Sequence, residues 1–545
     1  MTVLWRQTLH ELTSLRRQPI TMILSIGFPL VFFVLIAALT GNQVIDDAGG
    51  VRLVQFLAPG FASFGVVMAT FSFLAYGFAE ARAAGVIKRQ SGTPAPSWVL
   101  LGGRIGAALL LGLIATALVL SAGVLFYDLQ LFARSAAAIV VALVLAAMTF
   151  SALGLAVAVF LPSPHVTMAV TNGIAIPLAF VSDIFAFGGS GAMPAWLTRV
   201  GEFFPLKHLV NVFADGLNPY QTGHGFQLDH LGVIAAWGVA GTLVAAWGLR
   251  REKDAVTVGG RSGRGKVPAA DRVPRRTSAP SAVTLLAGQV RHTTLVLWRD
   301  PSAVFFAVVF PVLLAVLIPT VNGGADQVLD NGQMLGGFFA ATMAVYGVAV
   351  TAFVNMPAGL AESRDAGVLK RIRATPLPAW AMLTGRVVGA VVIGVLTLVA
   401  IYVVVGFAFG VAVPVSWLAA LGVFLVASVC FALMGLAVLS LIRSESAVIG
   451  VSLGTLLPLT FISEVFVIGV TFPGPLEALS QVFPLRHAAN AMTTAVAGDS
   501  LVAGLAWNHL GVLALWGAAG LVVTVWRFRW IATEPRPTTV IGPRS

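Results

Sequence analysis

Long intervals without a charged residue restrict the fold of this chain more than any other feature. They include 53–79, 105–127 and 231–249, and one interval of 48 residues at 135–182. A helix that crosses a bilayer needs about 20 apolar residues. A water-soluble domain carries roughly a quarter charged residues, whereas only 10% are charged here. The pattern therefore predicts an all-α polytopic membrane protein.

Dividing the charge-free intervals at their proline-containing breaks gives twelve expected transmembrane helices, because proline cannot continue a helix. The first half holds them at 18–45, 53–79, 105–127, 135–182 (two spans, divided at "LPSPH") and 231–249. The second half holds them at 302–325, 331–361, 387–442 (two spans, divided at "GVAVPVS"), 446–463 and 501–526. We therefore expect two units of six helices.

The distribution of Lys and Arg predicts the orientation of these helices. With the N-terminus in the cytoplasm, the inner segments hold 28 of the 33 basic residues and the outer segments hold five. Cytoplasmic loops of membrane proteins carry such an excess, so we expect both termini inside. The net charge of +11 then follows from topology and gives no reason to expect a nucleic-acid partner.

The two units repeat one another. Residues 80–104 and 362–386 align without a gap and are identical at 14 of 25 positions. "PLAFVSDIF" returns as "PLTFISEVF", "FPLKH" as "FPLRH" and "HLGVIAAWG" as "HLGVLALWG". Because six spans return the chain to the side on which it began, the repeats are parallel and related by an axis along the membrane normal.

This repetition predicts the domain boundaries. The two six-span halves are expected at 1–249 and 282–530, each opening with a helix on the membrane surface, at 1–18 and 282–300. A flexible basic linker, rich in Arg, Gly, Pro and Ser, is expected at 250–281, and a cytoplasmic tail at 531–545.

The duplicated stretch after the second span has a fixed order of residue types. An acid at the end of the span (Glu80 or Glu362) is followed by a glycine (Gly85 or Gly367), a basic pair and then Thr-Pro-x-Pro. Glycine permits a helix to end, and residues before proline favour extended backbone. We expect a short basic helix along the inner surface, presented to a cytoplasmic partner; an ordinary basic loop is the simpler alternative.

The order E-x-R-x-x-G-x-x-K-R-x-x-x-T-P-x-P, together with F-P-L-[KR]-H before the sixth span, resembles the ABC transporter type 2 permeases, the membrane subunits of bacterial drug, antibiotic and lipid exporters. The resemblance covers both halves and implies two six-span permeases fused in tandem. It also implies a bacterial inner-membrane location and a cytoplasmic ABC ATPase partner, in two copies, with ATP and magnesium held on that partner and no cofactor in this chain.

In that family the loop after the second span carries the coupling helix that contacts the ATPase. The resemblance therefore implies contacts at Glu80, Arg82, Gly85, Lys88, Arg89, Thr93 and Pro94, and at Glu362, Arg364, Gly367, Lys370, Arg371, Thr375 and Pro376. The first copy has "QSG" where the second has "IRA", so the two contacts need not be equivalent.

A nucleotide-binding motor is not expected within this chain. "GRSGRGK" at 260–266 has the spacing of a phosphate-binding loop, but Val267 and Pro268 follow where Ser or Thr and a helix are required. The segment is interpreted as part of the basic linker, and the chain as a transport subunit without enzymatic activity of its own.

Two acids at matching positions keep an ion-coupled carrier open as the alternative. Asp183 and Glu464 lie near the outer ends of the fifth spans, and ionisable groups in spans often relay ions. We expect them to face Lys207 and His208, and Arg486 and His487, as an outer gate or as structural ion pairs. The histidines show no metal-ligand spacing, so no metal site is expected.

The family resemblance places the transport pathway between the halves, along the second and fifth spans. These spans are rich in Phe and Met, which adapt to bulky apolar shapes. The expected pathway residues are Phe64, Met68, Phe71, Asn172 and Phe180, with Phe339, Met343, Tyr346, Phe353 and Asn355. We expect export of hydrophobic or amphipathic compounds, in contact with membrane lipid, by alternating access; a scaffold without transport activity is the weaker alternative.

Overall fold

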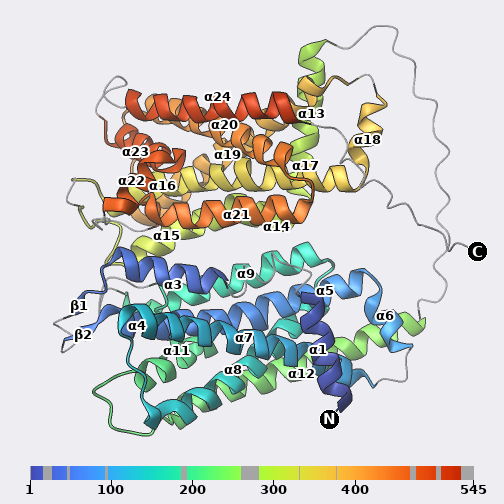
Figure 1. The fold of residues 1–545 in the computed structure, drawn as a ribbon, viewed down its shortest axis with the longest axis vertical. Coiled ribbons are helices and arrows are strands. Elements are labelled where there is room, and N and C mark those ends of the chain that lie inside the picture. Colours follow the sequence, from blue (N-terminus) through green and yellow to red (C-terminus); the bar gives the residue numbers. More distant parts are fainter. Residues whose placement is uncertain are drawn as a thin grey trace, which may run out of the picture.

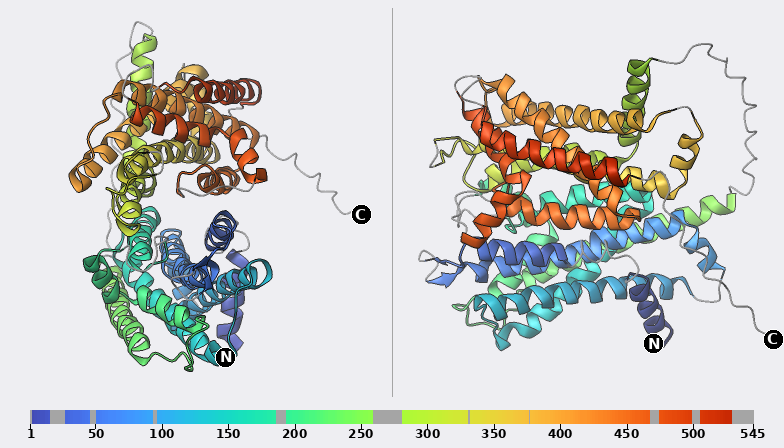
Figure 2. Two further views of the ribbon diagram at one scale, coloured as in Figure 1. Left: turned by 90° about the vertical axis from the view of Figure 1, so that its left-hand side faces the viewer. Right: turned by 45° about the horizontal axis from the view of Figure 1, so that its top comes forward.

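The structure is a computed structural model. It describes residues 2–15, 27–45, 50–92, 96–185, 193–258, 281–329, 332–375, 377–466, 474–498 and 505–528. Two helical bundles, one from each half of the sequence, lie side by side with their long helices roughly parallel (Figure 1). The views in Figure 2 show the same two-part arrangement from other sides.

The first bundle contains α1 (Thr2–Leu15), α3 (Phe28–Leu39), β1 (Val44–Ile45), β2 (Val51–Arg52), α4 (Leu53–Val67), η3 (Met68–Phe73), α5 (Leu74–Ala83), α6 (Val86–Ser91), α7 (Ser97–Tyr127), α8 (Ala133–Phe160), α9 (Pro164–Val181), α10 (Ala195–Phe203), α11 (Pro205–Gly216) and α12 (Leu228–Val258). The two short strands form an antiparallel pair in which Val44 lies opposite Arg52.

The second bundle repeats this order with α13 (Ala282–Trp298), α14 (Pro301–Val304), η4 (Phe305–Val309), α15 (Phe310–Val321), α16 (Leu335–Ala349), η5 (Val350–Asn355), α17 (Met356–Asp365), α18 (Val368–Arg373), α19 (Ala379–Phe409), α20 (Trp417–Leu441), α21 (Glu445–Ile462), α22 (Gly474–Val482), α23 (Pro484–Ala497) and α24 (Trp507–Arg527).

The helical, multi-span character expected from the sequence is confirmed. Within the described residues, eleven helices are long and apolar enough to cross a membrane, and a shorter apolar helix, α3, stands where the first span was expected. In lipid the backbone has no water to bind, so a helix that satisfies its own hydrogen bonds is favoured. Part of the expected first span, 16–26, lies outside the described residues, so the count of twelve stays a prediction.

Helices α1 and α13 occupy the segments expected to form surface helices, and each packs across the start of a third span. Their place on the membrane surface stays a prediction. A Cβ on Gly103 would lie 2.3 Å from Cγ of Gln7, and one on Gly385 would lie 2.3 Å from Cβ of Gln289. Glycine at these two positions is therefore what lets the helices cross so closely. The expected linker boundary differs from the structure, because α12 continues as a helix to Val258.

The second span of each bundle is its most buried helix and contains a π-helical segment, η3 in one and η5 in the other. A glycine on the fourth span packs against each segment: a Cβ on Gly154 would lie 2.6 Å from the carbonyl oxygen of Phe71, and one on Gly435 would lie 2.5 Å from that of Ala352. π-Helical turns are rare in proteins, and those that do occur are often found at functional sites.

The bundles meet along α3 and α9 of the first half and α14, α15 and α21 of the second. Phe32 on α3 meets Phe461 on α21 edge to face, with ring centroids 4.2 Å apart. Gly173 on α9 lies close to Phe305, whose ring a Cβ at that position would approach to 3.3 Å. This interface is mostly apolar and encloses the cavity described next.

Candidate functional site

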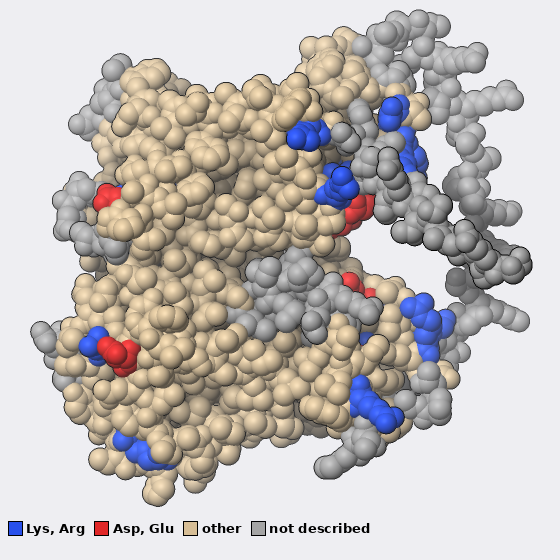
Figure 3. Space-filling model, in the orientation of Figure 1, with Lys and Arg blue, Asp and Glu red and all other residues tan. Residues whose placement is uncertain are grey.

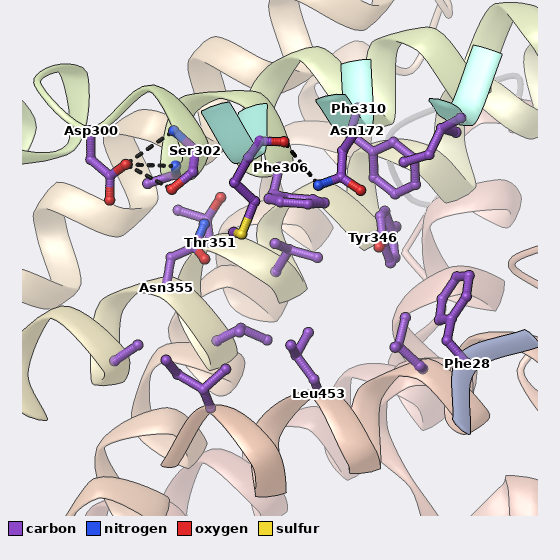
Figure 4. A pocket seen from close by; sticks show the side chains of 18 of the residues that line it. Phe28, Asn172, Asp300, Ser302, Phe306, Phe310, Tyr346, Thr351, Asn355 and Leu453 are labelled. Carbon is purple, nitrogen blue, oxygen red and sulfur yellow. Dashed lines mark hydrogen bonds between the residues drawn. The ribbon is translucent and has the colours of Figure 1, made fainter. Parts of the chain in front are cut away.

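A cavity of about 630 Å³ lies between the two bundles. Its walls come from α3, α4, η3, α5 and α9 on one side and from α13 to α17, α19 and α21 on the other. Figure 4 shows side chains from both halves directed into it. The volume falls within the usual range of about 300–1,000 Å³ for small-molecule sites.

One part of the cavity is lined by aromatic side chains. Phe185 lies 5.6 Å from Phe64 and 4.8 Å from Phe180 between ring centroids, and Tyr346 lies 5.0 Å from Phe466. Aromatic rings in such edge and tilted contacts present a large apolar surface. This part of the cavity therefore suits an apolar group of a ligand.

Polar side chains line another part (Figure 4). Asp300 caps α14, its Oδ1 accepting hydrogen bonds from the backbone N of Ser302 at 3.0 Å and from the Ser302 hydroxyl at 2.7 Å. Asn172 donates to the carbonyl oxygen of Met168 at 2.8 Å. The buried Nδ2 of Asn355 has no hydrogen-bond partner among the described residues. Because a buried donor without an acceptor is costly, Asn355 is a candidate contact for a ligand.

The structure brings together six of the ten residues expected along the pathway. Lining the cavity are Phe64, Met68, Asn172, Phe180, Tyr346 and Asn355. The other four are buried in helix packing away from it: Phe71, Phe339, Met343 and Phe353. Helices that are apolar on every face give no periodic signal that separates cavity-facing from packing residues.

The two matching inner loops adopt the expected local structure. α5 and α17 end near Gly85 and Gly367, which have φ of +68° and +70°, and the short helices α6 and α18 follow. Both short helices lie at one end of the molecule (Figure 1). Basic side chains gather there, and acidic ones lie beside the cleft between the halves (Figure 3).

Ten of the fourteen expected ATPase contacts fall into three groups. The side chains of Lys88, Arg89, Lys370, Arg371 and Thr375 are exposed, as a docking surface requires. Glu80 is half-buried and Glu362 is exposed, and both line the central cavity. Thr93, Pro94 and Pro376, which were also expected as contacts, lie outside the described residues.

The loop arginines Arg82 and Arg364 bind backbone within their own bundles. Arg82 donates to the carbonyl oxygen of Val159 at 3.1 Å and also to that of Leu161. Arg364 donates to the carbonyl oxygens of Leu439 at 3.2 Å and Ile442 at 2.8 Å. The last carbonyls of a helix lack partners within it, so each arginine caps the fourth span and fixes the inner loop to it.

The expected outer ion pairs are present. Lys207 Nζ lies 3.2 Å from Asp183 Oδ2, and Arg486 Nη2 lies 3.2 Å from Glu464 Oε1. Both acids occupy left-handed backbone, with φ of +63° and +58°, just after α9 and α21 end. The basic partners are buried while the acids are partly exposed, which is typical of structural pairs at a boundary.

His208 and His487 do not face these acids, contrary to expectation. The Nδ1 of His208 lies 2.6 Å from Nδ1 of His230, and the Nδ1 of His487 lies 2.8 Å from that of His509. The Nε2 of His208 lies 2.8 Å from a backbone carbonyl oxygen. That nitrogen therefore donates, so in a neutral ring Nδ1 accepts from the partner histidine.

The histidine pairs explain a repeated motif whose role the sequence did not reveal. His230 and Trp237 belong to "HLGVIAAWG", and the Trp237 indole donates to the carbonyl oxygen of Phe203 at 2.9 Å. Trp516 donates to the carbonyl oxygen of Val482 at 2.9 Å in the second half. The motif thus fixes the sixth span to the helices that precede it.

Comparison with known proteins agrees with this architecture. The chain is similar to the inner membrane transport permease YadH of Escherichia coli strain K12, with 23% identity over 213 residues, covering 39% of this chain and 80% of that protein. It is also similar to the daunorubicin resistance ABC transporter permease protein DrrB1 of Streptomyces coeruleorubidus, with 32% identity over 227 residues, covering 39% of this chain and 76% of that protein.

A model of one protein family matches the chain twice, at residues 1–217 and 288–496. The two matches correspond to the two bundles and confirm the tandem duplication. This chain is therefore a multi-pass membrane protein that belongs to the ABC-2 type transporter family.

Proposed function

We propose that this chain is the membrane-spanning subunit of an ATP-driven exporter in the bacterial inner membrane, with both termini in the cytoplasm. A separate ABC ATPase, in two copies, binds the inner loops and carries the ATP and magnesium. Closure of the ATPase dimer moves these loops and rocks the halves between inward- and outward-open states. The chain itself contributes the pathway and has no catalytic step.

One observation carries this proposal: two matched short helices, α6 and α18, lie at the same end of the molecule on either side of the cavity. Arg82 and Arg364 tie each loop to the fourth span of its own bundle. A force applied to α6 or α18 therefore acts on a whole bundle, as alternating access requires.

The cavity supports the expected substrate class. Its aromatic wall suits hydrophobic or amphipathic compounds, and the relative DrrB1 is named for daunorubicin resistance. We infer that drugs, antibiotics or lipids of this kind are moved out of the cell.

Transport into inside-out vesicles tests the proposal. Vesicles containing this chain, with or without its ATPase, are given a fluorescent amphiphile and ATP with magnesium. We expect uptake only when the ATPase and a hydrolysable nucleotide are both present. Full uptake by this chain alone, driven by a proton gradient and lost in D183N/E464Q, would overturn the proposal in favour of an ion-coupled carrier.

The docking surface is tested in the same vesicles. K88Q/R89Q and K370Q/R371Q should each reduce ATP-dependent uptake, because they remove exposed charge from α6 and α18. Arg134→Gln, an exposed change near the start of α8, is the matched control. Equal uptake in all three variants would contradict docking at these helices.

A further inference from the structure

The two bundles differ at one matched arginine near the inner end of the third span. In the first bundle Arg104 pairs with Glu11, with Nε 3.4 Å from Oε1. In the second bundle Arg386 occupies the corresponding place, but the position that corresponds to Glu11 is Thr293. The hydroxyl of Thr293 donates to the carbonyl oxygen of Gln289 at 2.9 Å in its own helix. The second bundle thus keeps the arginine but has no carboxylate at the position of Glu11.

Arg386 is buried and lines the cavity, and no described residue serves as its counter-ion. It is 7% exposed and lines the cavity together with Thr293. Its Nε has no hydrogen-bond partner, and it forms no ion pair among the described residues. Removing a charge from water costs several kcal/mol unless another charge compensates it. The site is therefore suited to an anionic group that enters the cavity.

Carboxylates collect at another part of the inner cavity. Glu80 from the first bundle and Glu362 and Glu445 from the second all line it. The backbone N of Glu445 donates to Oδ2 of Asp365 at 3.2 Å. This hydrogen bond places Glu445 beside the end of α17, which also carries Glu362. None of the three carboxylates has an ion pair or hydrogen bond to a described residue.

The nearby groups do not neutralise this acidic cluster. Asp365 lies next to Glu445 but also 4.0 Å from Nε of Arg364, so this arginine offsets Asp365 and leaves the three glutamates without a partner among the described residues. His165 is a basic group that acts on Glu445. His165 also lies 3.7 Å from Asp300, a fourth acid in the cavity lining. The cluster therefore favours a cationic group, separate from the anionic group that Arg386 favours.

We propose that the central cavity binds an amphiphile with a zwitterionic headgroup. The anionic group binds Arg386, the cationic group binds Glu80, Glu362 and Glu445, and the tail lies among the aromatic side chains. A purely cationic amphiphile would leave Arg386 without a partner. A purely anionic amphiphile would be repelled by the three carboxylates. The proposal rests on the proposed function in taking this cavity as the transport site.

Binding of tail-matched probes tests the charge preference. The full chain, purified in dodecyl maltoside, is titrated with dodecylphosphocholine, dodecyl phosphate or dodecyltrimethylammonium, and binding is followed by native mass spectrometry. We expect the zwitterion to bind at least about tenfold more tightly than either the anionic or the cationic probe, since a charged hydrogen bond contributes about 1.5–3 kcal/mol. Equal binding of the three probes would overturn the proposal.

Two substitutions test the role of Arg386. Arg386→Gln should weaken the zwitterion and the anion by about tenfold and leave the cation unchanged. Thr293→Glu recreates the pair seen in the first bundle, so it should raise the thermal stability and abolish the preference for the zwitterion. Arg104→Gln is the matched control, with no effect on probe preference. Unchanged zwitterion binding in both Arg386→Gln and Thr293→Glu would contradict the anionic subsite, and Thr293→Glu covers the case in which Arg386→Gln fails to fold.

Replacing the three glutamates tests the cationic subsite. The E80Q/E362Q/E445Q variant should lose the cation and weaken the zwitterion, while the anion binds at least as well as before. Full cation binding in this variant would contradict the subsite. Because these measurements need neither ATPase nor nucleotide, their failure leaves ATP-dependent uptake intact and is distinguishable from failure of the proposed function.

A zwitterionic headgroup can come from a membrane phospholipid or from another amphiphile. Lipid extracted from purified protein distinguishes the two. Enrichment of phosphatidylethanolamine in the wild type over Arg386→Gln identifies a phospholipid. Equal retention in the two proteins, with the zwitterion preference intact, identifies an amphiphile supplied from outside the bilayer.

Discussion

Arg364 donates a hydrogen bond of 2.8 Å to the carbonyl oxygen of Ile442 and so ties the inner loop of the second half to the end of its fourth span. A second hydrogen bond, to Leu439, completes a fork that the planar guanidinium can make and an ammonium group cannot. Arg82 makes the same fork in the first half. The arginines that follow the second spans thus link each inner loop to the end of the fourth span in the same bundle.

Replacing Arg364 by Lys or Gln should loosen this link. We expect Arg364→Gln to lower the free energy of unfolding by about 1.5–3 kcal/mol, the value of hydrogen bonds to a charged group, with Arg364→Lys intermediate. ATP-dependent uptake should fall further than substrate binding. The exposed Arg371→Gln on α18 is the control for stability, measured by thermal unfolding in detergent. If Arg364→Gln and Arg371→Gln unfold at the same temperature, the hydrogen bonds of Arg364 do not stabilise the bundle.

The two outer ion pairs should respond unequally to loss of their acids. Asp183→Asn leaves the buried Lys207 without a carboxylate, and we expect a loss of about 2 kcal/mol, less than for a fully buried pair because Asp183 is 44% exposed. Glu464→Gln should cost less, since Arg486 also has Glu477 at 3.8 Å and the Ser480 hydroxyl at 2.5 Å.

Lys207→Met is the informative companion to Asp183→Asn, because it removes the buried charge and leaves the acid partly in water. It should be the milder change of the two in thermal unfolding. The reverse order would mean that the ammonium group is well solvated in the native state.

The left-handed glycines before the short helices should be sensitive to a side chain. Gly85→Ala and Gly367→Ala place a Cβ where φ is +68° and +70°, at a cost of about 1–2 kcal/mol. Each should reduce ATP-dependent uptake by misdirecting α6 or α18, while probe binding in the cavity stays intact. Gly77→Ala, in the adjacent helix with nothing within 4 Å of its Cβ, should leave uptake unchanged.

The raised pKa of Asp215 leads us to expect that stability depends on pH. Burial raises the pKa of its carboxyl above the usual value, His230 opposes the shift and Asp229 adds to it. The folded state therefore holds this proton more tightly than the unfolded state, and the stabilisation is present below pH 3.8 and lost as pH rises through the raised pKa. Asp215→Asn should thus melt higher than the wild type at pH 7, with the gap closing toward pH 4. A constant gap would exclude titration of Asp215 as its cause.

The sequence predicted the helices and their repetition well, for a physical reason. Lipid leaves the backbone few alternatives to the helix, so charge-free length alone places most of the spans. The pairing of Asp183 with Lys207 also followed from the sequence, because both belong to motifs repeated as Glu464 and Arg486. The repetition of both motifs in the second half thus indicated which residues pair, which the local sequence pattern alone does not show.

The features that the sequence missed depend on backbone atoms or on distant partners. Arg82 binds carbonyl oxygens, which every residue has, so no residue type marks its target. His208 forms a hydrogen bond with His230, which lies 22 positions later and beyond a loop. The π-helical turn at Met68–Phe73 has the composition of any apolar helix, and its counterpart, Gly154, lies on another span. A reader of the sequence who does not know where this turn lies cannot tell which way the Phe71 side chain points.

The unequal arginines also bear on how an amphiphile would lie in the cavity. Arg104 pairs with Glu11, whereas Thr293 stands at the position that would pair with Arg386, a difference that a homodimer encoded by one short gene would be unable to maintain. Two identical subunits would offer a bound molecule two poses of equal energy, related by the twofold axis. A single polypeptide with one unpaired arginine removes this equivalence, so in the proposed binding mode the amphiphile takes one orientation.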